Sequence, residues 1–155
     1  MHRTDATLAL YGDDVRVGER AKLGSYHVTA EDIVSFARQW DPQFFHVDPD
    51  RAAAEGHFGG LIASGVHTLA IYQRLSIDSR VQHWHVIGGA GIRDLQLRRP
   101  VRPGDTLTGA TVVTDVALQP ERCRALVKYA GELTNQHDER VLALTMSAYL
   151  RMRTP

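Results

Sequence analysis

The amino-acid sequence predicts an α+β domain in which an antiparallel sheet wraps around one buried helix. Two observations carry this prediction. Segment 64–75 is apolar on most sides of a helix, which is typical of a helix enclosed by other elements. Later segments alternate apolar and polar residues at period two, which is typical of long strands with one buried face.

The elements before the buried helix are short. We expect residues 1–20 to form an irregular N-terminal arm and residues 22–28 to form the first strand. Thr29 is a typical N-cap, and apolar residues at i, i+3, i+4 and i+7 behind it predict an amphipathic helix that ends before Pro42. Asp48 is a second predicted N-cap, because a proline follows it at the first helical position.

The strands follow the buried helix. We predict them over residues 92–99, 106–116, 124–134 and 141–152. The Pro103-Gly104 pair indicates a turn, because proline sets the first central residue and glycine can adopt a positive φ. Since no repeat or linker interrupts the chain, we predict a single domain over residues 1–155.

Composition limits the classes of function. The chain has 155 residues and 17.2 kDa, which is the size of one ordinary domain. Its 18 basic and 18 acidic residues give zero net charge, which argues against nucleic-acid or anionic-membrane binding driven by bulk charge. The single Cys123 excludes an intrachain disulfide and suits a reducing compartment. Because no targeting segment is visible, we expect a cytoplasmic protein.

Asp41 and His46 are the first candidate site. On a continuous helix their spacing would turn them about 140° apart, so only a loop that folds back after Pro42 could bring them together. Phe44 and Phe45 would supply apolar walls that strengthen a charge interaction there. Taken alone, these residues are more typical of a packed histidine and of an aspartate in an ordinary turn.

The glycine-rich segment 58–65 is the second candidate site. Ser64 can cap the buried helix, whose first amides are free donors at the positive end of the helix dipole. A carbonyl oxygen placed there would be polarised, as in an oxyanion hole. A simple turn and cap would use the same residues, and the two interpretations are compatible.

Three segments in order carry a resemblance to a known family. They are Asp-Pro-x-x-x-His-x-Asp at 41–48, Phe-Gly-Gly-Leu-Ile-Ala-Ser-Gly at 58–65 and Arg-Pro-Val-Arg-Pro-Gly-Asp at 99–105. Together they resemble the MaoC-like dehydratases, which include the (R)-specific enoyl-CoA hydratases of the hotdog fold. The resemblance implies that Asp41 and His46 are the catalytic pair. It also implies that the Gly65 backbone N–H contacts the thioester carbonyl.

The resemblance implies a reversible hydration of a trans-2-enoyl-CoA to an (R)-3-hydroxyacyl-CoA, a carbon–oxygen lyase reaction of fatty acid metabolism. No cofactor is implied beyond the coenzyme A or acyl carrier of the substrate, and no metal. Phe45, Ser64 and His67 are expected to line the substrate site. The chain departs from the family pattern at Ser64, where many members have histidine. A further departure is Gln73, which stands near the place of a supporting serine.

Two alternative functions remain open. One is a hotdog thioesterase, in which a carboxylate activates water against the carbonyl. The other is a non-catalytic protein that binds acyl thioesters. The pairing of Asp41 with His46 favours hydration, because hydration must take a proton from water and return one to the α-carbon.

A few other side chains give weaker indications of a site. Two histidines, His83 and His85, alternate as metal ligands on a strand do, but without a second ligand set they indicate a surface position. Arg98, Arg99 and Arg102 could contact coenzyme A phosphates, because guanidinium binds phosphate well, or they could be solvated charges.

A homodimer is the expected assembly. Glycines at positions 88, 89 and 91 lie in a strand-like stretch and would permit close approach of a second backbone. Because a long exposed sheet edge is a liability, we predict that two sheets join edge to edge.

Overall fold

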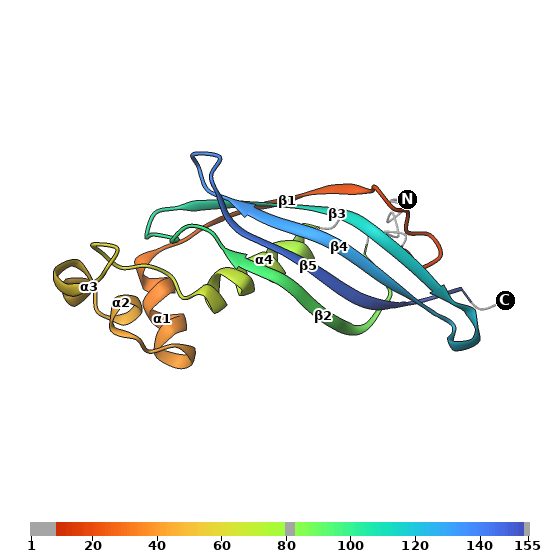
Figure 1. Cartoon of the computed structure of the whole chain (residues 1–155), viewed down its shortest axis with the longest axis horizontal. Coiled ribbons are helices and arrows are strands. Elements are labelled where there is room, and N and C mark those ends of the chain that lie inside the picture. The colour runs from red at the N-terminus through yellow and green to blue at the C-terminus, as the bar shows by residue number, and fades with distance from the viewer. Residues whose placement is uncertain (1–8, 80–82, 154–155) are drawn as a thin grey trace, which may run out of the picture.

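The computed structural model describes residues 9–79 and 83–153, and these form a five-stranded antiparallel sheet with helices gathered toward one end (Figure 1). The strands are β1 (Arg20–His27), β2 (Val86–Leu97), β3 (Thr106–Gln119), β4 (Arg124–Thr134) and β5 (Arg140–Arg151). Their order in the sheet is β1-β3-β4-β5-β2. Strands β1 and β2 are therefore the two edges.

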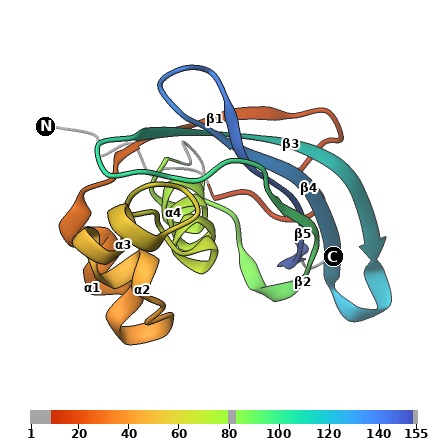
Figure 2. The ribbon, with the colours of Figure 1, turned by 60° about the vertical axis from the view of Figure 1, so that its left-hand side comes forward.

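The helices lie on the concave side of the sheet. They are α1 (Ala30–Trp40), α2 (Phe44–Val47), α3 (Pro49–Glu55) and α4 (Gly65–Asp78), with a 3₁₀ turn at Pro120–Arg122. Figure 2 shows the sheet curving around α4, with α1, α2 and α3 beside it. This arrangement confirms the predicted α+β architecture.

Side-chain caps determine where the helices begin. The Thr29 hydroxyl accepts a hydrogen bond from the Asp32 N–H, and the Asp32 carboxylate accepts one from the Thr29 N–H, which is a capping box. Asp48 caps α3 by accepting from the Arg51 N–H at 3.1 Å. Ser64 caps α4. All three predicted N-caps are confirmed.

The main core lies between α4 and the sheet. Tyr72 is fully buried there, and its ring lies over Gly131 of β4, where a Cβ atom would overlap it. Buried residues of this core also come from β1, α1, α4, β3, β4 and β5: Leu23, Ile33, Ile71, Leu75, Leu107, Leu133, Leu142 and Leu144. At the start of β5, Leu142 and Leu144 thus belong to the core that encloses α4.

The first part of the chain is packed rather than free. Residues 9–19 are irregular, as predicted, but Leu10 forms a bridge with Trp84 and Val15 is only 2% exposed. Val15 belongs to a second apolar cluster on β3, β4 and β5. This stretch is therefore an irregular lead-in that is also packed, because its apolar residues cover the part of the sheet beyond α4. Residues 1–8 lie outside the described residues.

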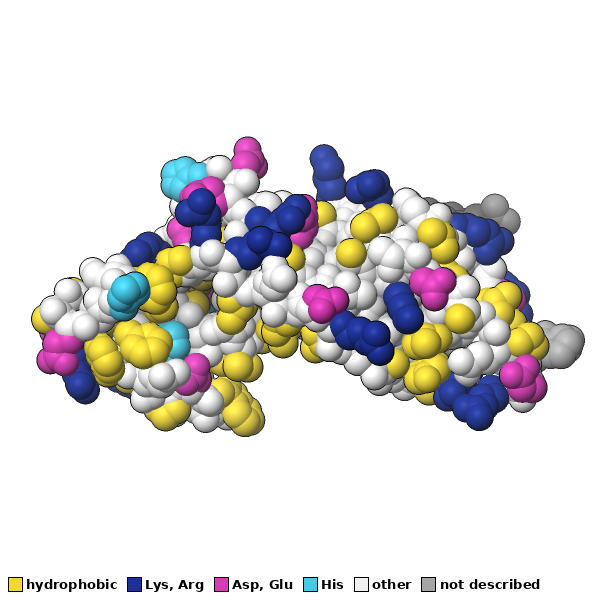
Figure 3. All heavy atoms as spheres, viewed as in Figure 1, with side chains coloured by type: hydrophobic (Ala, Val, Ile, Leu, Met, Phe, Trp, Pro, Cys, Tyr) yellow, Lys and Arg dark blue, Asp and Glu magenta, His cyan; other side chains and the backbone are white. Residues whose placement is uncertain are grey.

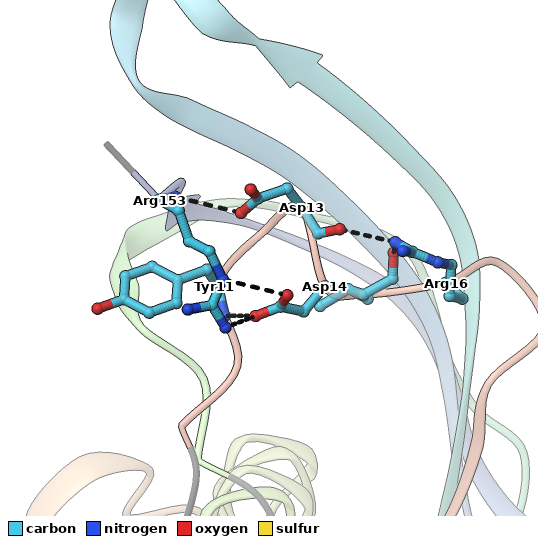
Figure 4. A network of polar contacts seen from close by, with 6 residues as sticks. Tyr11, Asp13, Asp14, Arg16 and Arg153 are labelled. Carbon is cyan, nitrogen blue, oxygen red and sulfur yellow. Dashed lines mark hydrogen bonds and ion pairs between the residues drawn. The ribbon is translucent and has the colours of Figure 1, made fainter. Parts of the chain in front are cut away.

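Polar contacts join this segment to the end of β5 (Figure 4). Arg153 forms an ion pair with Asp14 at 2.8 Å and lies over the ring of Tyr11. The Tyr11 N–H donates to the Asp14 carboxylate, and Arg16 donates to the Asp13 carbonyl oxygen. These contacts lower the pKa of Asp14, chiefly through its hydrogen bond with Arg153.

Strand β2 differs most from its prediction. It begins at Val86, six residues before the predicted start, and includes the three glycines. Its register with β5 shifts at three places, and Asp94 adopts a positive φ of 51°. Both faces of β2 are largely exposed, so burial imposes no period-two pattern on its sequence. Among the described residues, no helix has both the length and the apolar character required to cross a membrane.

Candidate active site

The structure brings Asp41 and His46 together. Helix α1 ends at Asp41, the chain reverses at Pro42, and the short α2 carries His46 back toward the end of α1. A hydrogen bond from the Gln43 N–H to the Asp41 carbonyl oxygen closes the turn at 2.8 Å. His46 Nε2 then lies 3.4 Å from Asp41 Oδ2.

The contact of His46 Nδ1 shows which ring nitrogen carries a proton. Nδ1 lies 2.6 Å from the Ile62 carbonyl oxygen, which can only accept, so Nδ1 carries a proton and donates it. In the neutral ring Nε2 is then an acceptor. The ring is 4% exposed and contacts the edge of Phe45, and the Phe45 carbonyl oxygen accepts from the Ile62 N–H. These contacts hold the imidazole in one orientation.

Two donors stabilise the Asp41 carboxylate. The Ser64 hydroxyl donates to Oδ2 at 2.7 Å, and the Gln43 side-chain amide donates to Oδ1 at 2.9 Å. These hydrogen bonds, the one from Ser64 foremost, lower the pKa of Asp41 against the opposing effect of burial, and His46 nearby contributes in the same direction. Asp41 is therefore ionised at neutral pH.

Ser64 joins the carboxylate to helix α4. Its fully buried hydroxyl donates to Asp41 and accepts from the Val66 N–H at 3.2 Å. Among the described residues, Ser64 is thus the serine that supports the pair. Gln73 instead lines a separate cavity of about 230 Å³ between α4 and strands β2 and β5. Gln73 lies more than two helical turns beyond Ser64, and its correspondence to the family's supporting serine stays a prediction.

A cavity of about 240 Å³ adjoins the pair. His46 and Gly65 both line it, and the other lining residues are Phe58, Ile62, Ala63, Thr68, Leu97, Arg98, Arg99, Pro100 and Val101. Gly65 is the first residue of α4, and within the described residues its N–H has no acceptor. A Cβ atom at Gly65 would overlap the side chain of Leu97. The glycine therefore leaves its amide open to the cavity.

Three residues expected to line the substrate site are absent from that lining. Phe45 lies behind His46, and Ser64 is enclosed between Asp41 and α4. His67 is buried between helices, with its ring stacked on Phe36 of α1 at 4.6 Å. Burial lowers the pKa of His67, while the charge of Asp32 opposes this shift. His67 therefore contributes to helix packing.

The two histidines before β2 lie apart from this cavity. The ring of His85 stacks on Tyr11 at 3.9 Å, and the His83 carbonyl oxygen accepts from the Leu10 N–H. Across residues 9–79 and 83–153, no group of three or more histidine, cysteine or acidic side chains is placed to hold a metal ion.

Comparison with known proteins gives the family. The MaoC-like domain matches residues 14–134, which is most of the chain. The chain belongs to this family. An uncharacterized protein of Bacillus subtilis, YdeM, is 37% identical over 110 residues, covering 71% of this chain and 76% of that protein. The three motifs that carried the resemblance all begin within the matched range.

Solved structures show the fold of this MaoC-like protein. A MaoC-like dehydratase from Rhodospirillum rubrum superposes with a TM-score of 0.82 and 36% identity, covering 94% of this chain and 99% of the other. The R-hydratase PhaJ1 from Pseudomonas aeruginosa has a TM-score of 0.75 at 22% identity, covering 94% and 88%. The hotdog fold is thereby confirmed. The family supports a hydratase or dehydratase.

Proposed function

We propose that this MaoC-like protein hydrates a trans-2-enoyl thioester of coenzyme A or an acyl carrier, reversibly, to the (R)-3-hydroxyacyl thioester. One observation carries the proposal. His46 and the Gly65 amide line the same cavity, while Asp41 lies 3.4 Å from His46. A proton-transfer pair and an unoccupied backbone donor thus face the same small volume.

The pair is suited to hold one water molecule. When the imidazole is in its neutral form, Nε2 of His46 and Oδ2 of ionised Asp41 are both acceptors, so they cannot bond to each other directly. A water molecule that donates one hydrogen to each satisfies both. Its oxygen lone pairs then point away from the pair and toward a substrate in the cavity.

The chemical steps balance with these groups. The water oxygen bonds to the β-carbon as one water proton moves to His46 Nε2, because the lowered pKa of Asp41 makes its carboxylate the weaker base. The π electrons shift onto the thioester oxygen, where the Gly65 N–H stabilises the enolate. The enolate collapses as Nε2 returns the proton to the α-carbon. The net change is addition of water across the double bond.

A spectroscopic assay tests the proposal. Purified protein is mixed with trans-2-butenoyl-CoA, and the conjugated-enoyl absorbance and the free thiol are followed together. Hydration removes the absorbance and releases no thiol. Release of thiol would instead identify a thioesterase. No change in either signal, with acyl chains of several lengths, would indicate a non-catalytic protein that binds acyl thioesters. The Asp41→Asn variant controls for a contaminating hydratase.

A further inference from the structure

The segment between β2 and β3 carries three arginines within five residues, and it forms one wall of the cavity. Arg98 and Arg99 line the cavity directly. Arg102 is not among the lining residues, but its guanidinium donates to the carbonyl oxygen of Phe58, which is one of them, at 2.9 Å. All three arginines are exposed at their outer ends. The mouth of the cavity is therefore bordered by guanidinium groups.

Among the described residues, one of these three charges is paired with a carboxylate. Arg99 forms an ion pair with Glu139 at 2.9 Å. The bond from Arg102 goes to a neutral carbonyl, so it leaves the positive charge uncompensated. Within the described part of the chain, the side chain of Arg98 makes no hydrogen bond or ion pair. Figure 3 shows Lys and Arg side chains, interspersed with acidic ones, near the β4–β5 hairpin on the face drawn there.

The backbone that carries the arginines is held in place. The Arg98 N–H donates to the Val141 carbonyl oxygen at 2.9 Å, and the Ala63 N–H donates to the Val101 carbonyl oxygen at 2.8 Å. The Asp105 carboxylate accepts from the Arg102 N–H and from the Gln136 side chain, each at 2.9 Å. The backbone positions of Arg98 and Arg102, the two arginines without a carboxylate partner, are thus fixed relative to the cavity.

We propose that Arg98 and Arg102 bind the phosphate groups of the carrier that bears the thioester. This inference rests on the proposed function, in which the thioester occupies the cavity and its carrier must leave through the mouth. Guanidinium groups bind phosphate through two parallel charge-assisted hydrogen bonds, and an arginine without a carboxylate partner keeps its donors for that contact. The carrier phosphate of phosphopantetheine is common to coenzyme A and to acyl carrier proteins.

The test measures binding, so it does not depend on turnover. Isothermal titration of the full-length protein with coenzyme A, 4′-phosphopantetheine and pantetheine compares ligands that differ in their phosphates. We expect Arg98→Gln and Arg102→Gln each to weaken coenzyme A binding about tenfold, the usual worth of one hydrogen bond to a charged group. Neither substitution should change pantetheine binding. Added salt should weaken binding to the wild type more than to the double variant.

The control variant removes the same charge at a distant site. Arg151→Gln removes the same charge at the far end of β5 and should bind coenzyme A like the wild type. Thermal unfolding of each variant verifies that it is folded. Tighter binding of coenzyme A than of phosphopantetheine identifies the nucleotide phosphates, and equal binding identifies the single shared phosphate. Unchanged coenzyme A binding in the double variant, or an equal loss for pantetheine, would overturn the proposal. A failed hydration assay alone would overturn only the reaction.

Discussion

At the scale of single residues, the water held between Asp41 and His46 makes a quantitative prediction. Asp41→Asn and His46→Ala should each lower kcat by at least about a hundredfold, since a general acid or base is typically worth about 10²–10⁴-fold. The double variant should be little worse than the poorer single variant, because groups that act on one water are not additive. KM should change much less, since neither group holds the acyl chain. Steady-state kinetics on all three variants provides the measurement.

Two results would contradict this mechanism. A fully active Asp41→Asn protein would remove the carboxylate from it. Losses that multiply in the double variant would show that the two groups act independently. Gln43→Glu is a useful companion variant, because it replaces a donor to Asp41 with a second carboxylate and should raise the pKa of Asp41.

The opening at Gly65 predicts a second loss of activity. Gly65→Val places a branched side chain against Leu97 and across the open amide, so most activity should disappear. Leu97 is 55% exposed and can move aside, so the variant should remain folded. Circular dichroism and the hydration assay together separate the two effects. Activity near that of the wild type would place the thioester carbonyl elsewhere.

Part of this site could be predicted from the sequence. The spacing across Pro42 indicated that Asp41 and His46 could meet, and a helix cap was evident at Ser64. The contact between Ser64 and Asp41 spans 23 residues and depends on how α4 packs against α1, so no local pattern reports it. A serine placed directly before the glycine of the motif was the available signal. The cavity that Gln73 lines depends on how α4 packs against β2 and β5, which no local pattern reports either.

At the scale of elements, His67 links the packing of α1 and α4 to pH. Its pKa is lowered in the folded protein, chiefly by burial, so below about pH 6.5 the unfolded chain binds the proton more readily. The stabilising effect of neutral His67 is present above that pH and is lost as pH falls toward the lowered value. The free energy of unfolding should therefore decrease on acidification from about pH 7 in urea titrations.

A matched pair of variants isolates this effect. His67→Leu removes the titrating ring and should flatten the pH dependence, whereas His137→Gln changes an exposed histidine in the β4–β5 hairpin and should leave it intact. A pH profile that is identical in the wild type and His67→Leu would show that His67 does not cause the decrease.

The contact between α4 and β4 makes the next prediction. Gly131→Ala forces a methyl group into the ring of buried Tyr72, so it should destabilise the fold by about 1–3 kcal/mol, as overpacked cores do. Gly60→Ala makes the same chemical change at a site whose nearest neighbour is 3.7 Å away, and should cost about 0.5 kcal/mol or less. Urea denaturation of both variants gives the comparison. Equal stability would mean that Tyr72 has room to shift.

Element prediction succeeded where one face of each element is buried. Strand β4 has the predicted bounds, because its inward residues alternate strictly with outward ones. The start of β2 was missed by six residues, since both of its faces are exposed and glycines replace the alternating side chains. The packed residues 9–19 were missed because their partners on β3, β4 and β5 lie about 100 or more residues later.

At the scale of the whole molecule, the edge strand β2 predicts a homodimer. Five of its large apolar residues are 40–55% exposed, namely Val86, Ile87, Ile92, Leu95 and Leu97. In the part of the chain that the structure describes, no atom lies within 4 Å of a Cβ placed at Gly88 or Gly89, which leaves room for a second backbone. Light scattering at micromolar concentration should therefore give twice the 17.2 kDa chain mass.

Charge on this edge should weaken the dimer. Leu95→Lys places an ammonium group on β2 and should shift the mass toward 17.2 kDa, whereas Leu118→Lys, at a comparably exposed position on β3, should not. A 17.2 kDa particle for the wild-type protein would refute the assembly.

The Ser64 hydroxyl makes two hydrogen bonds at once, and this has a consequence for engineering. One oxygen holds the start of the central helix and also lowers the pKa of Asp41. A substitution at Ser64 therefore changes both the thermal stability of the protein and the lowest pH at which Asp41 is ionised. A library screened only for heat resistance would change the pH optimum without selecting for it, and a library screened only for activity in acid would sample the melting temperature in the same way.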